Sequence, residues 1–184
     1  NYSPKKQSSV IKIITVGRFV KQKDYETAIA CIAGLKEMCP TIKFKFIIVG
    51  YGELESQVRL WVNAYKIGDF TDIMINPNNI PQLEYDADIY LSTSLFEGTS
   101  NSIMEGMNAN LPVVCTDVGD NYCLVKEKVN GFLCKTGDVH TLSLRLKELL
   151  EANDLRENMG KKSKEILADN FGVDIFLKRY LDLI

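Results

Sequence analysis

The sequence predicts an α/β domain with a doubly wound parallel sheet and helices on both of its faces. Strand-like and helix-like segments alternate along most of the 184 residues, as in layered α/β folds. The strongest strand segments are continuous apolar runs, which is typical of parallel strands covered on both faces. Two of these runs, residues 10–17 and 43–50, both end in glycine. A chain of this length can bury one sizeable core or two small ones.

The side-chain pattern supports each segment in turn. Residues 1–9 are polar and patternless, which indicates a linker, so we expect one domain over residues 10–184. Apolar residues recur at helical spacing in 24–38, and Pro40 follows that helix. The remaining strands are predicted at 72–75, 87–93, 111–116 and 131–134. The remaining helices are predicted at 53–65, 82–86, 121–128, 138–152, 154–168 and 173–184, with another beginning among residues 100–102.

Composition narrows the classes of function. The net charge is only −2, so we expect no nucleic-acid partner. No apolar run approaches the roughly 20 residues that span a bilayer. Five cysteines without a C-x-x-C pair fit a reducing cytoplasm and predict no zinc site, and Cys31 and Cys115 are expected in the core. His140 is the only histidine and is expected at the surface, so Ser-His-Asp chemistry has little basis.

Three of the loops that follow strands carry short polar motifs. Ligands bind outside the carboxyl ends of the strands in such a sheet. The first loop places Arg18 and Lys23 between a strand end and a helix start, which fits an anion site or a solvated surface loop. The Gly50-x-Gly52 motif is an incomplete dinucleotide fingerprint, and a tight turn explains it better. Turn chemistry explains residues 117–120 adequately.

The stretch "FEGTSNSIMEGM", residues 96–107, carries two glutamates in different settings. Glu97 belongs to a loop, whereas Glu105 falls in the first or second turn of the helix. Free backbone N–H groups at that helix start suit a phosphate, and carboxylates suit hydroxyl groups. A nucleotide sugar combines both kinds of group. Alternatively, Ser102 and Glu105 form a capping box and Glu97 is an exposed acid.

The order of these motifs resembles the C-terminal half of GT-B-fold retaining glycosyltransferases of group one, also called family four. The resemblance covers residues 10–170 and rests on "VGRFVKQKD", "FIIVGYGE", "DADIYLSTSLFEGTSNSIMEGMNANLPVVCTDVGD" and "NGFL". The glutamate pair Glu97 and Glu105, with seven residues between, is the family's signature. The chain departs from the family at three positions. The family often has a second glycine where this chain has Asp120, and an acidic residue near the position of Cys123. Gly106 stands where the family commonly has an alanine.

The resemblance implies a role for each matching residue. Arg18 and Lys23 would hold the donor diphosphate, and Gly17 would be a further donor-binding residue. Glu97 would contact the transferred sugar. These two cations and Glu97 are the expected catalytic residues. Glu105 would accept the ribose hydroxyls, and the base would lie near Ile75 and Asn76. The backbone that lines the sugar and phosphates would be Gly98, Thr99, Ser100, Asn101 and Ser102.

The resemblance also implies a function. We expect the donor-binding domain of a retaining glycosyltransferase, which moves a sugar from a nucleoside diphosphate sugar to an acceptor hydroxyl in bacterial polysaccharide or glycolipid synthesis. Neither a metal nor another cofactor is expected. The acceptor glycan or glycolipid would bind through a missing N-terminal domain. The full-length protein would be cytoplasmic, with possible peripheral contact at the inner face of the membrane.

Four alternatives remain at this point. A GT-B-fold nucleotide-sugar epimerase would share the donor site, and a non-enzymatic nucleotide-sugar binding module would need no second domain. A glycosidase would need two carboxyl groups at roughly 5–9.5 Å around one bond, but the phosphate-type loops argue against it. A dinucleotide-dependent oxidoreductase is disfavoured by the incomplete glycine fingerprint.

Overall fold

The computed structural model describes residues 10–171, which form a six-stranded parallel sheet in the order β3-β2-β1-β4-β5-β6. This confirms the predicted fold class. The strands are β1 (Ile11–Arg18), β2 (Phe44–Tyr51), β3 (Thr71–Ile75), β4 (Ile89–Ser92), β5 (Val113–Thr116) and β6 (Gly131–Cys134). The α-helices are α1 (Tyr25–Met38), α2 (Glu55–Ala64), α3 (Ile80–Tyr85), α4 (Asn101–Asn108), α5 (Asn121–Leu124), α6 (Val139–Glu151) and α7 (Asn153–Phe171). Two short 3-10 helices are η1 (Lys21–Lys23) and η2 (Gly68–Phe70).

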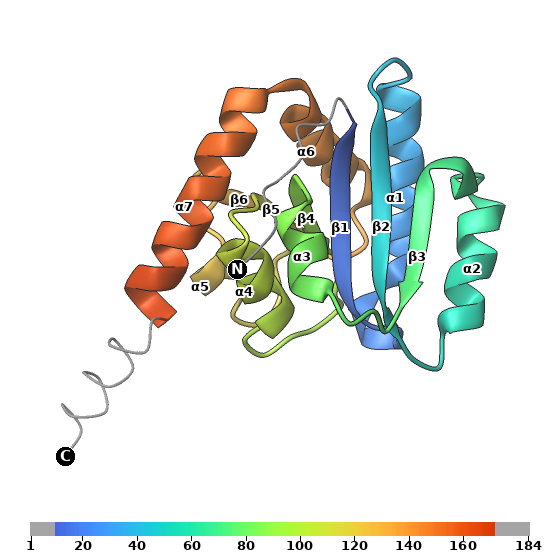
Figure 1. The fold of residues 1–184 in the computed structure, drawn as a ribbon, viewed down its shortest axis with the longest axis horizontal. Coiled ribbons are helices and arrows are strands. Elements are labelled where there is room, and N and C mark those ends of the chain that lie inside the picture. Colours follow the sequence, from blue (N-terminus) through green and yellow to red (C-terminus); the bar gives the residue numbers. More distant parts are fainter. Residues whose placement is uncertain (1–9, 172–184) are drawn as a thin grey trace.

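Helices cover both faces of the sheet, and each face has its own apolar core (Figure 1). One core packs α1, α2 and α6 against the sheet, and the other packs α3, α4 and α5 against the opposite face. Helix α7 begins against the first core and reaches the second through Ile166 and Leu167. Cys31 and Cys115 are fully buried, and His140 is exposed, as predicted.

The strand order reverses between β1 and β4, which places their carboxyl ends side by side at the topological switch point. The loop that follows β1 carries the two cations singled out above, the loop that follows β4 carries Glu97, and the helix after that loop carries Glu105. The doubly wound topology therefore brings segments about 75 residues apart in the chain to one edge of the sheet, as in the pair Ile13 and Ile89.

Gly50 corrects one expectation from the sequence, because it lies inside β2 rather than in a turn. A side chain at this position would place its Cβ 1.9 Å from the carbonyl oxygen of Gly17 on β1. Glycine is required there by the close approach of two backbones. Gly52 does occupy the turn, with a φ of 150° that other residues rarely adopt.

The predicted helices occur with shifted boundaries. The helix expected at 154–168 extends over Asn153–Phe171, and the one expected at 121–128 ends at Leu124, where Val125 becomes extended. The linker at 1–9 and the helix at 173–184 lie outside the described residues.

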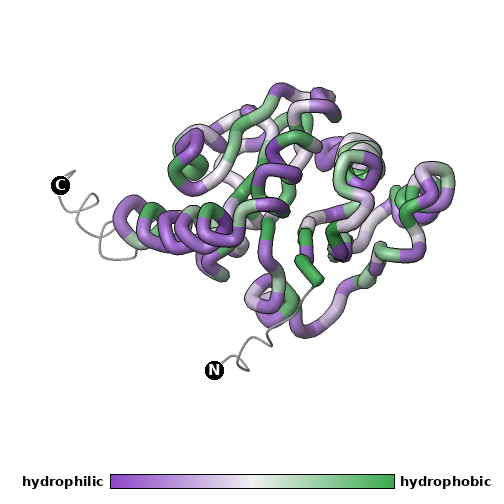
Figure 2. Tube along the Cα trace, turned by 90° about the horizontal axis from the view of Figure 1, so that it is seen from above, coloured by the Kyte–Doolittle hydropathy of each residue, from purple (hydrophilic) through white to green (hydrophobic). Residues whose placement is uncertain are grey.

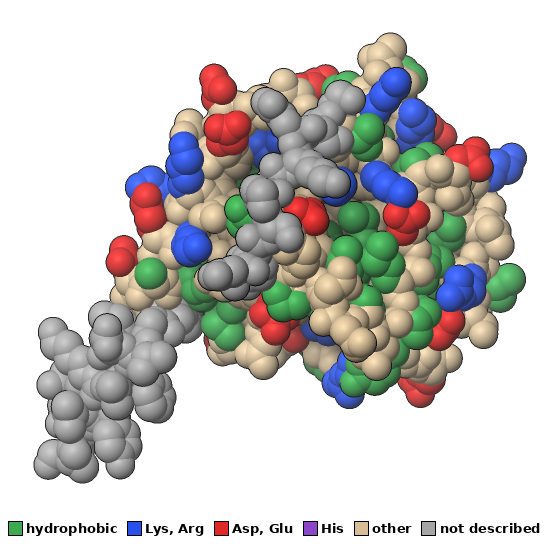
Figure 3. Space-filling model, in the orientation of Figure 1, with side chains coloured by type: hydrophobic (Ala, Val, Ile, Leu, Met, Phe, Trp, Pro, Cys, Tyr) green, Lys and Arg blue, Asp and Glu red, His purple; other side chains and the backbone are tan. Residues whose placement is uncertain are grey.

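The surface carries both charged and apolar side chains, and Leu60 and Phe96 are among the exposed hydrophobic residues. Helix α7, which leads to the grey C-terminal trace, is largely hydrophilic along its length (Figure 2). On the face shown in Figure 3, Lys and Arg side chains are interspersed with Asp and Glu side chains around the described part of the chain. Within residues 10–171, every helix is too short or too polar to cross a membrane.

Candidate donor-binding cleft

A cleft of about 360 Å³ opens at the carboxyl ends of the central strands. It collects residues from the ends of β1 and β2, the loop after β3, the loop before α4 and the first turns of α4. Its lining residues are Val16, Gly17, Arg18, Gln22, Lys23, Gly50, Tyr51, Asn76, Ile80, Glu97, Thr99, Asn101, Ser102 and Glu105. Nine of the twelve residues singled out from the sequence are in this set, whereas Ile75, Gly98 and Ser100 lie beside it.

Lys23 and Glu97 form an ion pair at this cleft. The Lys23 Nζ atom lies 2.5 Å from Oε1 of Glu97, and the two side chains are only 17% and 8% exposed. Glu97 is therefore not the freely exposed loop acid that the sequence left open. A charge-assisted hydrogen bond in a sheltered position fixes both groups, which makes their placement specific.

Two further side chains hold Glu97, and the sequence analysis missed both. Ser94 is fully buried, and its hydroxyl donates to Glu97 Oε1 at 2.7 Å. Gln22 Nε2 donates to Glu97 Oε2 at 3.4 Å and to the carbonyl of Phe96 at 2.9 Å. The backbone N–H of Leu95 in turn donates to the carbonyl of Gln22 at 2.8 Å. The loops after β1 and β4 are thus tied together around the glutamate.

The position of Lys23 is fixed by the start of α1. Asp24 has a left-handed φ of 45° and caps α1 by accepting from the N–H of Thr27. The hydroxyl of Thr93 donates to the carbonyls of Lys23 and Asp24, at 3.1 and 2.9 Å. The cation therefore projects from backbone that is bonded to the end of β4.

The loop after β5 packs against the loop that carries Glu97. Gly119 has a φ of 54°, and a Cβ there would lie 2.0 Å from the carbonyl oxygen of Glu97. Asp120 accepts from the Thr99 hydroxyl at 3.1 Å. Turn chemistry explains Gly119, as expected, and Asp120 has a further role in bonding the neighbouring loop.

The start of α4 overturns the capping-box alternative. Ser100, not Ser102, is the N-cap residue, and its hydroxyl contacts Ser102 Oγ at 3.3 Å instead of capping the backbone. Glu105 lies in the second turn, too far along for a capping box. The backbone N–H groups of the first turn of α4 therefore donate no capping hydrogen bond to the Ser100 side chain, so they remain available to a ligand. The first-turn residues Asn101 and Ser102 line the cleft.

Glu105 is exposed at the cleft, and partial desolvation by the residues around it raises the pKa of its carboxyl. Asn76 has a left-handed φ of 45°, and its N–H donates to the carbonyl of Gly50 at 3.0 Å. Arg18 is exposed at the mouth of the cleft, and its side chain makes no hydrogen bond or ion pair within residues 10–171. The roles expected for these residues stay predictions.

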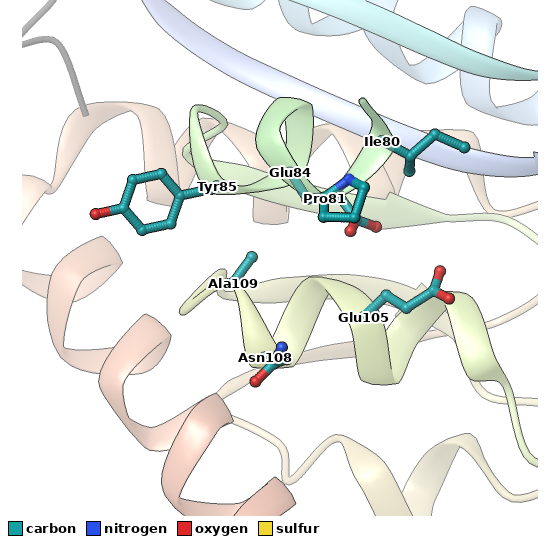
Figure 4. Close-up of a pocket in the computed structure, with 7 residues that line it drawn as sticks. All are labelled: Ile80, Pro81, Glu84, Tyr85, Glu105, Asn108 and Ala109. Atoms are coloured by element: carbon teal, nitrogen blue, oxygen red, sulfur yellow. The ribbon is translucent and has the colours of Figure 1, made fainter. Parts of the chain in front are cut away.

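A second cavity of about 350 Å³ adjoins the cleft between α3 and α4 (Figure 4). Ile80 and Glu105 line both spaces. The second cavity contains Glu84, which is only 3% exposed although the sequence places it between Leu83 and Tyr85 on a short helix. Sequence reasoning missed Glu84 because a glutamate on a six-residue helix is typical of the surface.

Comparisons with known proteins identify the family. The family model of glycosyl transferases group 1 matches residues 3–166, most of the chain. The chain is 28% identical over 180 residues to trehalose synthase of Thermococcus litoralis, covering 94% of this chain and 43% of that protein. It is 31% identical over 150 residues to the amylovoran biosynthesis glycosyltransferase AmsK of Erwinia amylovora, covering 76% of this chain and 36% of AmsK.

The fold agrees with this assignment. A complex of a variant of S. aureus TarM with Fondaparinux, alpha-GlcNAc-glycerol and UDP superposes with a TM-score of 0.89 at 19% identity, covering 100% of this chain and 37% of TarM. Sheet, topology and family model agree, so the chain belongs to the group 1 glycosyl transferases, a transferase family. It spans less than half the length of the curated relatives it matches.

Proposed function

We propose that this chain is the donor-binding domain of a retaining glycosyltransferase that uses a nucleoside diphosphate sugar. The observation that carries the proposal is the cleft that joins Lys23, Glu97 and Glu105 at one sheet edge. Cations, helix N–H groups and carboxylates face one space, and a nucleotide sugar presents a diphosphate, a sugar and a ribose diol. The UDP in the TarM complex supports the same class of ligand.

The proposed chemistry rests on charge. Breaking the bond between the sugar and the diphosphate builds negative charge on the leaving group. Arg18 and Lys23, together with the N-terminal turn of α4, would stabilise that charge electrostatically, without a metal ion. Glu97 would contact the transferred sugar, and Glu105 would accept the ribose hydroxyls.

The proposal also covers where the acceptor binds. Because the chain matches only 43% of one relative and 36% of another, we propose that a second domain of the full-length protein binds the acceptor glycan or glycolipid. We propose a role in bacterial polysaccharide or glycolipid synthesis, which relatives such as AmsK, named for amylovoran biosynthesis, support. We also propose that the full-length protein acts at the cytoplasmic face of the membrane.

A melting experiment tests the donor site. The 184-residue chain is titrated with UDP, GDP and ADP, with and without EDTA. A nucleoside diphosphate at 100 times its dissociation constant should stabilise the fold by about 2.7 kcal/mol. The proposal requires a shift with at least one of them that EDTA leaves unchanged. No shift at millimolar concentration would contradict the donor site, and loss of the shift with EDTA would contradict metal independence.

A further inference from the structure

Glu84 and Glu105 are two carboxyl groups that share one cavity between α3 and α4. Figure 4 shows both side chains extending into the space between these helices, Glu84 from α3 and Glu105 from α4. Glu84 is 3% exposed, and its Oε1 atom is buried without a hydrogen-bond partner. Neither glutamate forms an ion pair within residues 10–171. A buried carboxylate without a cation or donor is costly, so this arrangement favours a protonated Glu84.

The groups around Glu84 reinforce this conclusion. Burial first, and then the charge of Glu105, raises the pKa of Glu84 to about 8. From β4, Tyr90 is fully buried, and burial raises the pKa of its phenol well above the ordinary value, so it contributes no charge. On α3 itself, Tyr85 lines the cavity and Asp86 accepts from Gln82 Nε2 at 3.1 Å. Among the described residues, the charge that raises the pKa of Glu84 is therefore that of Glu105, and a like charge disfavours ionisation of Glu84.

We propose that Glu84 is a positioning residue whose neutral form keeps Glu105 available for the ribose diol, so that ionisation of Glu84 weakens nucleotide binding. The two carboxyls would then carry one negative charge between them at neutral pH. The inference rests on the proposed donor function, because Glu105 is the group through which Glu84 acts. It assigns a function to a buried acid outside the donor cleft.

The mechanism of this coupling is electrostatic. When Glu84 ionises, a buried carboxylate shares one cavity with the exposed carboxylate of Glu105, and the two like charges repel. Either Glu105 moves away from its partner and from the ribose position, or α3 separates from α4. The cleft also becomes more negative where a diphosphate must bind. Both consequences lower affinity for a nucleoside diphosphate as the pH rises.

The first experiment measures the pair directly and does not depend on any ligand. Carboxyl carbons of the 184-residue chain are followed by ¹³C NMR between pH 4 and 9.5, and Glu84→Gln and Glu105→Gln assign the two signals. We expect the Glu84 signal to titrate near pH 8 and to move to lower pH in the Glu105→Gln variant. A Glu84 signal that titrates with a pKa of about 4.3, the ordinary value for glutamate, would overturn the inference. A Glu84 pKa that stays the same in the Glu105→Gln variant would also overturn it.

The second experiment measures the consequence for binding. Dissociation constants of UDP, GDP and ADP are measured between pH 6.5 and 9.5 for the wild type, Glu84→Gln and the exposed control Glu37→Gln. We expect wild-type and Glu37→Gln affinity to fall by about threefold or more across pH 8, and Glu84→Gln to lose this dependence. An unchanged alkaline fall in Glu84→Gln would overturn the inference. Failure of all three nucleotides at every pH would overturn the donor function instead.

Discussion

The ammonium of Lys23 and the carboxylate of Glu97 are joined at 2.5 Å, although 74 residues separate them in the chain. Ser94 and Gln22 also donate to Glu97, so three donors converge on a single carboxylate. The group proposed to hold the diphosphate is therefore bonded to the group proposed to contact the sugar. If Lys23 holds the diphosphate as proposed, donor binding would divide its ammonium between Glu97 and the phosphate oxygens, which would link recognition of the two parts of the ligand.

Lys23→Gln should weaken nucleoside diphosphate binding. The variant removes a charged donor from the diphosphate, and such a hydrogen bond contributes about 1.5–3 kcal/mol. Isothermal titration with UDP, GDP and ADP measures the loss. Lys21→Gln is the matched control, because Lys21 is exposed on the same short 3-10 helix and does not line the cleft. Equal losses in both variants would show that only the net charge matters.

Glu97→Gln and Glu105→Gln should separate recognition of the sugar from recognition of the ribose. Glu105→Gln should weaken both the free nucleotide and the nucleotide sugar by about 1.5–3 kcal/mol, because both carry ribose. Glu97→Gln should weaken only the sugar-bearing donor, and it releases Lys23 from its ion pair, so affinity for the free nucleotide is retained or increased. Titration of both variants with UDP and matched UDP-sugars, or the base that binds best, checks this. Unchanged donor binding in both would make the pair structural.

Gly106→Ala should destabilise the fold even though the family commonly has alanine at this position. A Cβ there would lie 2.4 Å from Cδ2 of Tyr90, which is fully buried. Overpacking of this kind costs about 1–3 kcal/mol, measured by urea unfolding. Gly68→Ala is the control, because its nearest neighbour would lie 4.0 Å away.

The same contact predicts a favourable coupling between the two positions. Tyr90→Val removes the ring that the new methyl group of Gly106→Ala would strike, so the double variant should lose less stability than the sum of the single variants. Urea unfolding of the two single variants and the double variant measures the coupling. Strict additivity would show that Tyr90 does not restrict the size of the residue at this position.

Glu84→Gln should flatten the dependence of stability on pH. The folded pKa of Glu84 is raised from 4.5 to about 8, so its contribution to stability is complete below 4.5 and is lost as the pH rises through 8. Between these values the free energy of unfolding should fall by up to about 1.4 kcal/mol per pH unit. Urea unfolding at pH 5, 6.5 and 8 measures this slope in the wild type, Glu84→Gln and Glu37→Gln. A wild-type slope in Glu84→Gln would contradict the buried neutral acid.

Most of the fold and much of the cleft could be predicted from local patterns. Apolar runs and helical spacing located the strands and helices, and the rule for parallel sheets placed the loops at one edge. The role of Ser94 could not be predicted, because a serine after a strand has no distinctive pattern. Its role depends on the folded position of Glu97, to which its hydroxyl donates. The role of Gln22 could not be predicted either, because its partner Glu97 lies 75 residues away in the sequence.

The amino-acid sequence alone specified the parallel α/β architecture, because the burial of continuous apolar strands depends on their own side chains. It also determined which polar residues follow the strands. The ion pair between Lys23 and Glu97 and the burial of Glu84 in a cavity that it shares with Glu105 became visible only in the folded chain. Pairing and burial depend on which surfaces pack together, and the packing of α3 against α4 surrounds Glu84 with groups that its neighbours in the sequence do not reveal.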